Sequence, residues 1–117
     1  MPLRNWDMRV NDILDAIEKI SKYTSGMTEA QFYADEKTVD AVIRNFSIIG
    51  EAANAVPAEI QSSHPGVPWS ELIGMRNIVI HGYFKVSVSI VWTSLKSDLP
   101  SLVPLLNGLL SSQSSKP

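Results

Sequence analysis

The chain has 117 residues, 44% of them apolar and 19% charged, which indicates a single globular domain and excludes a disordered protein. It has no cysteine, which excludes a disulfide scaffold, and its two histidines show no metal-ligand spacing, so neither a metal nor another cofactor is predicted. The net charge is −2 and the basic residues are scattered, so any contact with nucleic acid is expected to be local.

Nothing in the sequence suggests export or a membrane partner. The segment 1–7 lacks the long apolar run of a signal peptide, and no window approaches the roughly 20 apolar residues of a membrane span. We therefore expect a soluble, cytoplasmic protein.

The first half of the chain predicts three helices. Apolar residues recur at helical spacing from about Trp6 to Tyr23. Residues 28–31 have the form of a capping box, which opens a short helix, and Asp35 can cap a long helix over about 36–55.

Small residues collect at the end of the long third helix, at Gly50, Ala52, Ala53 and Ala55. A face of small residues lets another helix approach closely. That helix could belong to the same chain or to a second subunit.

The same helix also carries polar residues, among them Asn45 and Ser47. Arg44 and Glu51 lie seven residues apart, hence two turns along one face. Both are candidates for a supporting contact with a site elsewhere. For each of these four polar residues, the alternative is a solvated face that carries ordinary charges.

Pro57 ends the third helix, and the composition of 62–68 indicates a loop in which His64 is expected to be exposed. Pro68 suits the first turn of a fourth helix over about 69–81. Gly74 within this helix suggests close packing at that point.

A fifth helix is predicted from a Ser87 cap, with a break or kink at 98–100 and further helical turns that Pro104 disturbs. The polar tail 111–117 is expected to be flexible. The sequence thus predicts an all-α protein, with four main helices and a short one in an up-down bundle that forms a single domain over 1–110.

Side chains that can bind ligands or transfer protons gather in 76–84, where the fourth helix ends. Asn77 and His81 lie one turn apart on one face, Arg76 lies on the neighbouring flank, and Tyr83 follows Gly82 on the exit loop. Histidine titrates near neutral pH and arginine carries a fixed charge, which suits proton transfer and phosphate binding. On its own, such a cluster is also consistent with an ordinary helix end whose polar side chains only form structural hydrogen bonds.

The pattern Arg76-x4-His81-x-Tyr83 resembles the signature of HepT-like toxins in the HEPN superfamily. Three flanking segments resemble the same family: 43–53 its long central helix, 69–77 its approach to the motif, and 83–100 its last helix. The resemblance extends from about Trp6 to Leu106.

The resemblance implies a HEPN-like homodimer that is the toxin of a type VII-like toxin–antitoxin pair. Arg76 and His81 would form a composite, metal-independent endoribonuclease site at the dimer interface, supported by Asn77, with tRNA as the expected substrate. The implied partner is a minimal nucleotidyltransferase antitoxin that transfers AMP from ATP to Tyr83 and silences the toxin. Arg44 and Glu51 are further candidates near this site.

Two other interpretations remain open from the residues. In the first, the chain is a non-catalytic subunit that binds a substrate or nucleotide for a separate nucleotidyltransferase. In the second, it is a plain helical dimerisation module.

Overall fold

A computed structural model of the chain describes residues 5–82 and 88–114, and within these ranges the side chains of 6–76 and 89–112. The described residues form an all-α structure, as predicted. The helices are α1 (Asn5–Thr24), α2 (Glu29–Ala34), α3 (Glu36–Asn54), α4 (Ala58–Ser63), α5 (Trp69–Gly82), α6 (Val88–Thr93) and α7 (Leu99–Ser114), with a π-helical turn at Ser94–Asp98 that joins α6 to α7.

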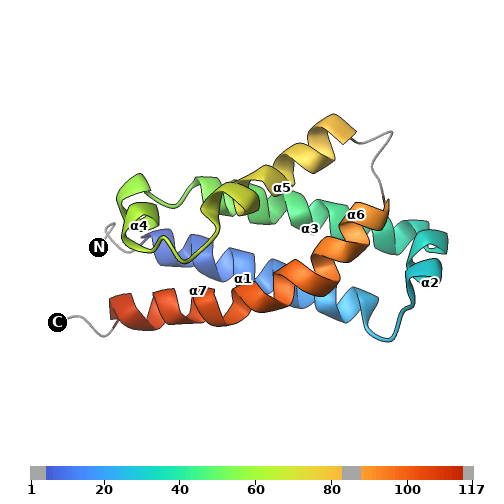
Figure 1. The fold of residues 1–117 in the computed structure, drawn as a ribbon, viewed down its shortest axis with the longest axis horizontal. Helices are drawn as coiled ribbons and strands as arrows, with labels where there is room; N and C mark the ends of the chain where they lie inside the picture. Colours follow the sequence, from blue (N-terminus) through green and yellow to red (C-terminus); the bar gives the residue numbers. More distant parts are fainter. Residues whose placement is uncertain (1–4, 83–87, 115–117) are drawn as a thin grey trace.

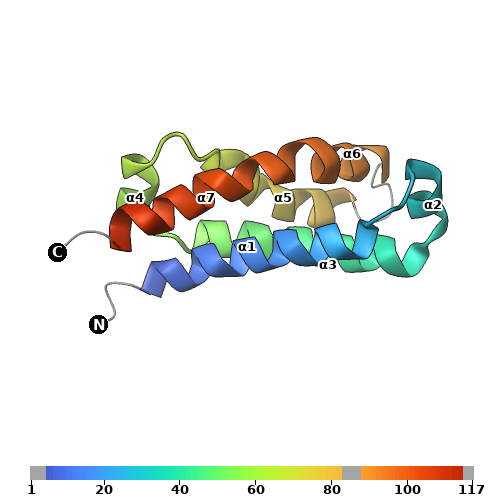
Figure 2. The same cartoon turned by 90° about the horizontal axis from the view of Figure 1, so that it is seen from below.

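The long helices form an elongated bundle in which α5, α3, α1 and α7 lie side by side in that order (Figures 1 and 2). The start of α1 and the end of α7 lie at one end of the bundle, and α2 and α6 lie at the other. Because α3 and α5 run in opposite directions, the last turn of α5 points toward the α2 end (Figure 1).

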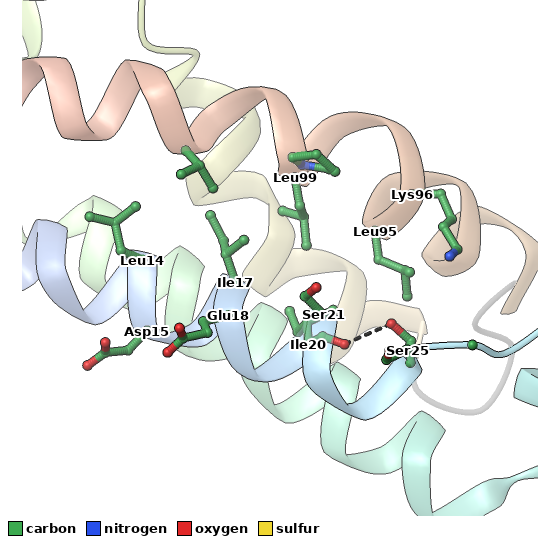
Figure 3. A pocket seen from close by; sticks show the side chains of 14 residues that line it. Leu14, Asp15, Ile17, Glu18, Ile20, Ser21, Ser25, Leu95, Lys96 and Leu99 are labelled. Carbon is green, nitrogen blue, oxygen red and sulfur yellow. Dashed lines mark hydrogen bonds between the residues drawn. The ribbon is translucent and has the colours of Figure 1, made fainter.

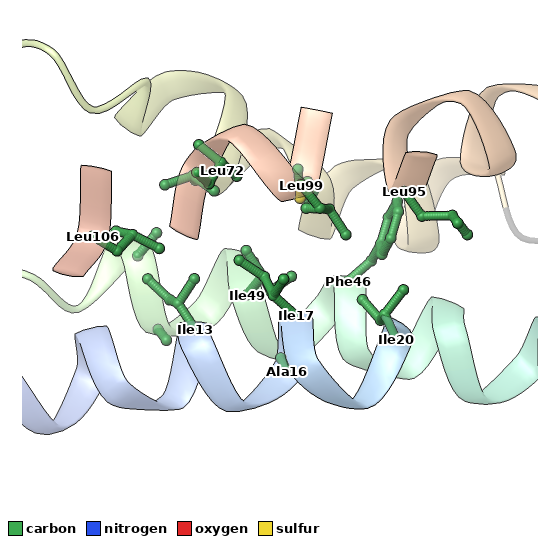
Figure 4. Close-up of a cluster of buried hydrophobic side chains, with 14 of the residues drawn as sticks. Ile13, Ala16, Ile17, Ile20, Phe46, Ile49, Leu72, Leu95, Leu99 and Leu106 are labelled. Atoms are coloured by element: carbon green, nitrogen blue, oxygen red, sulfur yellow. The ribbon is translucent and has the colours of Figure 1, made fainter. Parts of the chain in front are cut away.

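Apolar side chains at helical spacing bury themselves between these helices and form one core (Figure 4). Phe46 and Ile49 of α3, Leu72 of α5 and Leu106 of α7 are each completely buried. Burial on this scale stabilises the fold by roughly 1.5–3 kcal/mol for each large side chain. None of the described helices is long and apolar enough to cross a membrane.

The predicted caps of α2 and α3 are present. The Thr28 hydroxyl accepts the N–H of Gln31 at 3.1 Å, and the Gln31 side chain accepts the N–H of Thr28 at 2.9 Å. One carboxylate oxygen of Asp35 accepts the Thr38 N–H at 3.1 Å, and the other accepts its hydroxyl at 2.8 Å. These bonds hold the pKa of Asp35 below its usual range.

Of the break or kink expected at 98–100, the break is absent, because the helix continues through a π-helical turn at Ser94–Asp98. Leu99 donates its N–H to the carbonyl of Ser94, five residues earlier. The wider turn gives the ring of Pro100 room beside the preceding carbonyls, which a regular turn would not. Pro104 also lies inside α7, which continues to Ser114.

Candidate functional site

The motif lies on a single helix. The backbone of α5 is helical from Trp69 to Gly82, so Arg76, Asn77 and His81 occupy one continuous helical segment. Helical geometry places Asn77 and His81 one turn apart. The side chains of Asn77 and His81 lie outside the described part of the structure, and so does Tyr83, the predicted modification site.

Arg76 lies where α5 crosses α3, directly against Gly50. A Cβ atom added at Gly50 would lie 2.7 Å from both the Cβ and the backbone nitrogen of Arg76. Contacts that short do not occur between real side chains, so only glycine allows α3 to approach α5 this closely. The small residue on α3 is therefore explained by packing within the chain.

The same test contradicts the expectation for Gly74. A Cβ at Gly74 would meet no atom of the described residues within 4 Å. A close contact of α5 was correctly expected from the sequence. The glycine that allows it is Gly50 on α3, and not Gly74 on α5.

Glu51 follows Gly50 and forms an ion pair with Arg76, through its Oε1 and the Nη1 of the arginine. The Arg76 side chain is 36% exposed and that of Glu51 is 59% exposed. The pair thus lies at the surface of the α3–α5 crossing, where solvent and a ligand can reach it.

The Nε atom of Arg76 is buried and forms no hydrogen bond with any group that the structure describes. Burial closes the edge of the guanidinium that Nε shares with Nη2. The part of the guanidinium left for a ligand is the end of the fork, which carries Nη1 and Nη2.

Two of the other polar residues of interest on α3 have different surroundings. Arg44 is exposed, roughly 10 Å before Glu51 along the helix axis, and it forms no ion pair with Glu51 within the described residues. The solvated-face interpretation therefore fits Arg44. It is wrong for Asn45, which is buried and donates its side-chain N–H to the Ala41 carbonyl at 2.9 Å.

His64 is half-buried, which corrects the expectation of an exposed loop histidine. Its Nδ1 lies 3.2 Å from the Ile60 carbonyl and its Nε2 lies 3.4 Å from the Ser112 hydroxyl of α7. Its own carbonyl accepts the indole N–H of Trp69 at 3.1 Å. The histidine therefore links the end of α4 to the start of α5 and the end of α7, away from the motif.

A separate hollow of about 750 Å³ lies between α1 and the segment from Leu95 to Val103 (Figure 3). Asp15 and Glu18 stand on its α1 side and Lys96 on the other. The Lys96 amine lies 4.9 Å from the centre of the Trp92 ring. Because carboxylates outnumber the cation, this hollow does not suit a polyanion such as RNA.

Acidic and histidine side chains do not cluster in the parts of the chain that the structure describes. These parts hold no group of three or more that could bind a metal ion. The chemistry that the described site offers is therefore that of an arginine positioned by a carboxylate.

Comparison with known proteins adds to this geometry. A family model described as "Ribonuclease HepT-like" matches residues 13–108, a range that contains Gly50, Glu51 and the whole motif. The chain belongs to the HepT-like ribonuclease family. The family predicted from the motif is thus confirmed.

Several relatives of this HepT-like chain carry ribonuclease names. It is 43% identical over 93 residues to the "Probable ribonuclease HepT" of Thermococcus cleftensis, a match that covers 80% of this chain and 84% of the relative. It is 36% identical over 90 residues to a "Putative RNase" of Caldanaerobacter subterraneus subsp. tengcongensis, covering 77% and 80% of the two chains.

A third relative is a longer protein. The "Gamma-glutamylcyclotransferase and putative RNase" of Methanocaldococcus jannaschii is 41% identical over 93 residues, which cover 80% of this chain but 42% of the relative. No solved structure gives a significant match.

Proposed function

We propose that this HepT-like chain is a metal-independent endoribonuclease in which Arg76 and His81 act on a phosphodiester of RNA. The observation that carries the proposal is the partly exposed side chain of Arg76 on the same helix as His81. The ribonuclease names of the relatives support it.

RNA contains its own nucleophile, so these two residue types are sufficient for cleavage. The 2′-oxygen attacks the adjacent phosphorus and loses its proton, while the bond to the 5′-oxygen breaks and that oxygen gains a proton. His81 can exchange these protons near neutral pH, and Arg76 can stabilise the charge on the phosphate oxygens. The products carry a 2′,3′-cyclic phosphate and a 5′-hydroxyl.

Helix geometry favours a composite site made by two copies of the chain. Residues five apart on a helix point roughly 140° away from each other, so one α5 does not direct Arg76 and His81 at the same phosphate. In a homodimer, Arg76 of one copy can meet the imidazole of the other. Two copies also supply two histidines, one as base and one as acid.

We further propose that the protein is the toxin of a type VII-like pair, silenced by a minimal nucleotidyltransferase that acts on Tyr83. In that step the phenol oxygen of Tyr83 attacks the α-phosphorus of ATP, pyrophosphate leaves and the phenol proton is lost. The attached AMP would place an anion two residues from His81, where it competes with RNA.

The net charge of −2 supports a narrow substrate. A protein without a basic surface has little general affinity for RNA, so recognition has to come from the shape of one class, for which we propose tRNA. Arg44 is an exposed cation on the face of α3 that carries Glu51, and it would contact the RNA backbone.

The test is cleavage of a cellular tRNA pool by the AMP-free protein in excess EDTA. The parent is compared with Arg76→Ala and His81→Ala, each shown to be folded and of the same oligomeric state. Arg9→Ala and His64→Ala are the matched controls, because Arg9 is an exposed arginine of α1 and His64 is the other histidine of the chain.

We expect the parent and both controls to leave cyclic phosphate ends, and the two motif variants to lose cleavage. Cleavage that survives in both motif variants would show that the active site does not lie in this motif. A parent without cleavage that still binds nucleotide would favour the non-catalytic binding subunit. A requirement for a divalent metal would refute the metal-independent mechanism.

A further inference from the structure

We infer that Glu51 is a positioning residue for this ribonuclease: it holds the Arg76 guanidinium so that the Nη1–Nη2 end of the fork faces the scissile phosphate. The inference rests on the proposed function and extends it to a residue outside the linear motif.

Three contacts fix the arginine. The missing side chain at Gly50 lets the backbone of Arg76 lie against α3. The Nε atom is buried, and the carboxylate of Glu51 accepts a hydrogen from Nη1. Because the backbone, the Nε atom and the Nη1 atom of Arg76 are all held, the guanidinium keeps one orientation.

The remaining donors define the ligand. Glu51 uses one of the two Nη1 hydrogens, and burial closes the edge that Nε shares with Nη2, so one hydrogen of Nη1 and one of Nη2 stay available. At the end of the fork these two are nearly parallel and match two oxygens of one phosphate group. The site therefore takes the oxygens of a phosphodiester at the end of the fork.

The charge of Glu51 opposes this role in one respect. Its carboxylate lies beside the phosphate position and repels the substrate before any bond is broken. Removal of Glu51 should therefore slow turnover, because Arg76 loses its orientation, without weakening substrate binding. A substitution that only damaged the fold would lower both turnover and substrate affinity.

The first experiment measures kcat and KM for tRNA cleavage with Glu51→Ala and Glu51→Gln. Glu18→Ala and Glu18→Gln are the matched controls, because Glu18 is exposed in the middle of α1 and faces the separate hollow. We expect Glu51→Ala to lower kcat by about 10- to 100-fold, as an ångström-scale misplacement does, with KM unchanged or lower.

Glu51→Gln should recover much of kcat, because the amide oxygen still accepts a hydrogen from Nη1. This partial recovery separates positioning from proton transfer. If Glu51→Gln were as inactive as Glu51→Ala, Glu51 would act as a base and the inference would be wrong. The isosteric variant also decides the question if Glu51→Ala is poorly folded.

The second experiment is chemical rescue of Arg76→Ala with free guanidinium ion at concentrations that leave the fold intact. We expect guanidinium to restore part of the cleavage by Arg76→Ala and little of that by the double variant Glu51→Ala, Arg76→Ala, because Glu51 binds the added cation. Equal rescue of the two proteins would overturn the inference.

The positioning role of Glu51 and the ribonuclease activity can be refuted separately. If Arg76→Ala is inactive but Glu51→Ala turns over like the parent, the positioning role falls and the ribonuclease stands. If the AMP-free parent does not cleave RNA, both fall together.

Discussion

Replacing Gly50 with alanine should damage the protein through a single methyl group. That methyl would lie 2.7 Å from the Cβ and backbone nitrogen of Arg76, where ordinary contacts are about 3.5–4.0 Å, so α5 has to move by about 1 Å. Overpacking of this kind costs about 1–3 kcal/mol, and the better helix propensity of alanine offsets about 1 kcal/mol of it.

Gly108→Ala is the control that isolates the steric effect. Gly108 lies in α7, and a Cβ there meets nothing within 4 Å. The two substitutions share the gain in helix propensity, so the free energy of unfolding of Gly50→Ala should lie about 1–3 kcal/mol below that of Gly108→Ala.

Urea unfolding followed by circular dichroism measures this difference, and a tRNA cleavage assay measures its effect on the site. Because α5 carries Arg76, a shift of about 1 Å should lower cleavage by up to about 100-fold in Gly50→Ala and leave Gly108→Ala active. If both variants gained the same stability and cleaved like the parent, the close contact between α3 and Arg76 would not exist in solution.

The caps of α2 and α3 give two further predictions. Thr28→Ala should lower the free energy of unfolding by about 1 kcal/mol in urea, because the hydroxyl that accepts the Gln31 N–H is lost, whereas Thr28→Ser should keep most of it; equal loss in both would contradict the capping role. The lowered pKa of Asp35 means that its cap contributes stability above the pKa of the unfolded chain and loses it as the pH falls through the folded pKa. Urea unfolding between pH 6 and about pH 2 should therefore show the parent losing its advantage over Asp35→Asn below about pH 4, and a constant difference would refute this.

The sequence predicted the helices well because most signals were local. The cap residues Thr28 and Asp35 and the apolar periodicity of α1 and α3 act within a few residues, and the structure has each of them. The prolines at 100 and 104 were misleading, because whether a helix tolerates a proline depends on the turn before it. No residue pattern announced the π-helical turn at Ser94–Asp98.

The candidate site was only partly predictable, for a related reason. The motif on α5 is local in sequence, so its helix could be placed. The partner of Arg76 is not local: Glu51 lies 25 residues earlier, and the distance from Gly50 to α5 depends on how two helices cross. From sequence spacing alone, Arg44 and Glu51 were equally good candidates for a contact with the site. In the structure Glu51 contacts Arg76, whereas Arg44 is exposed.

Gly50 and Glu51 are consecutive residues that meet the same arginine by opposite means, one through an absent side chain and the other through a charged one. A survey of all single substitutions, selected for RNA cleavage, should therefore find tolerance lost at two neighbouring positions for unrelated reasons. Position 50 would reject every side chain regardless of polarity, while position 51 would reject most residues but retain those that accept a hydrogen bond. That paired signature on α3 would reveal the place of Arg76 to an observer who had no knowledge of the motif on α5.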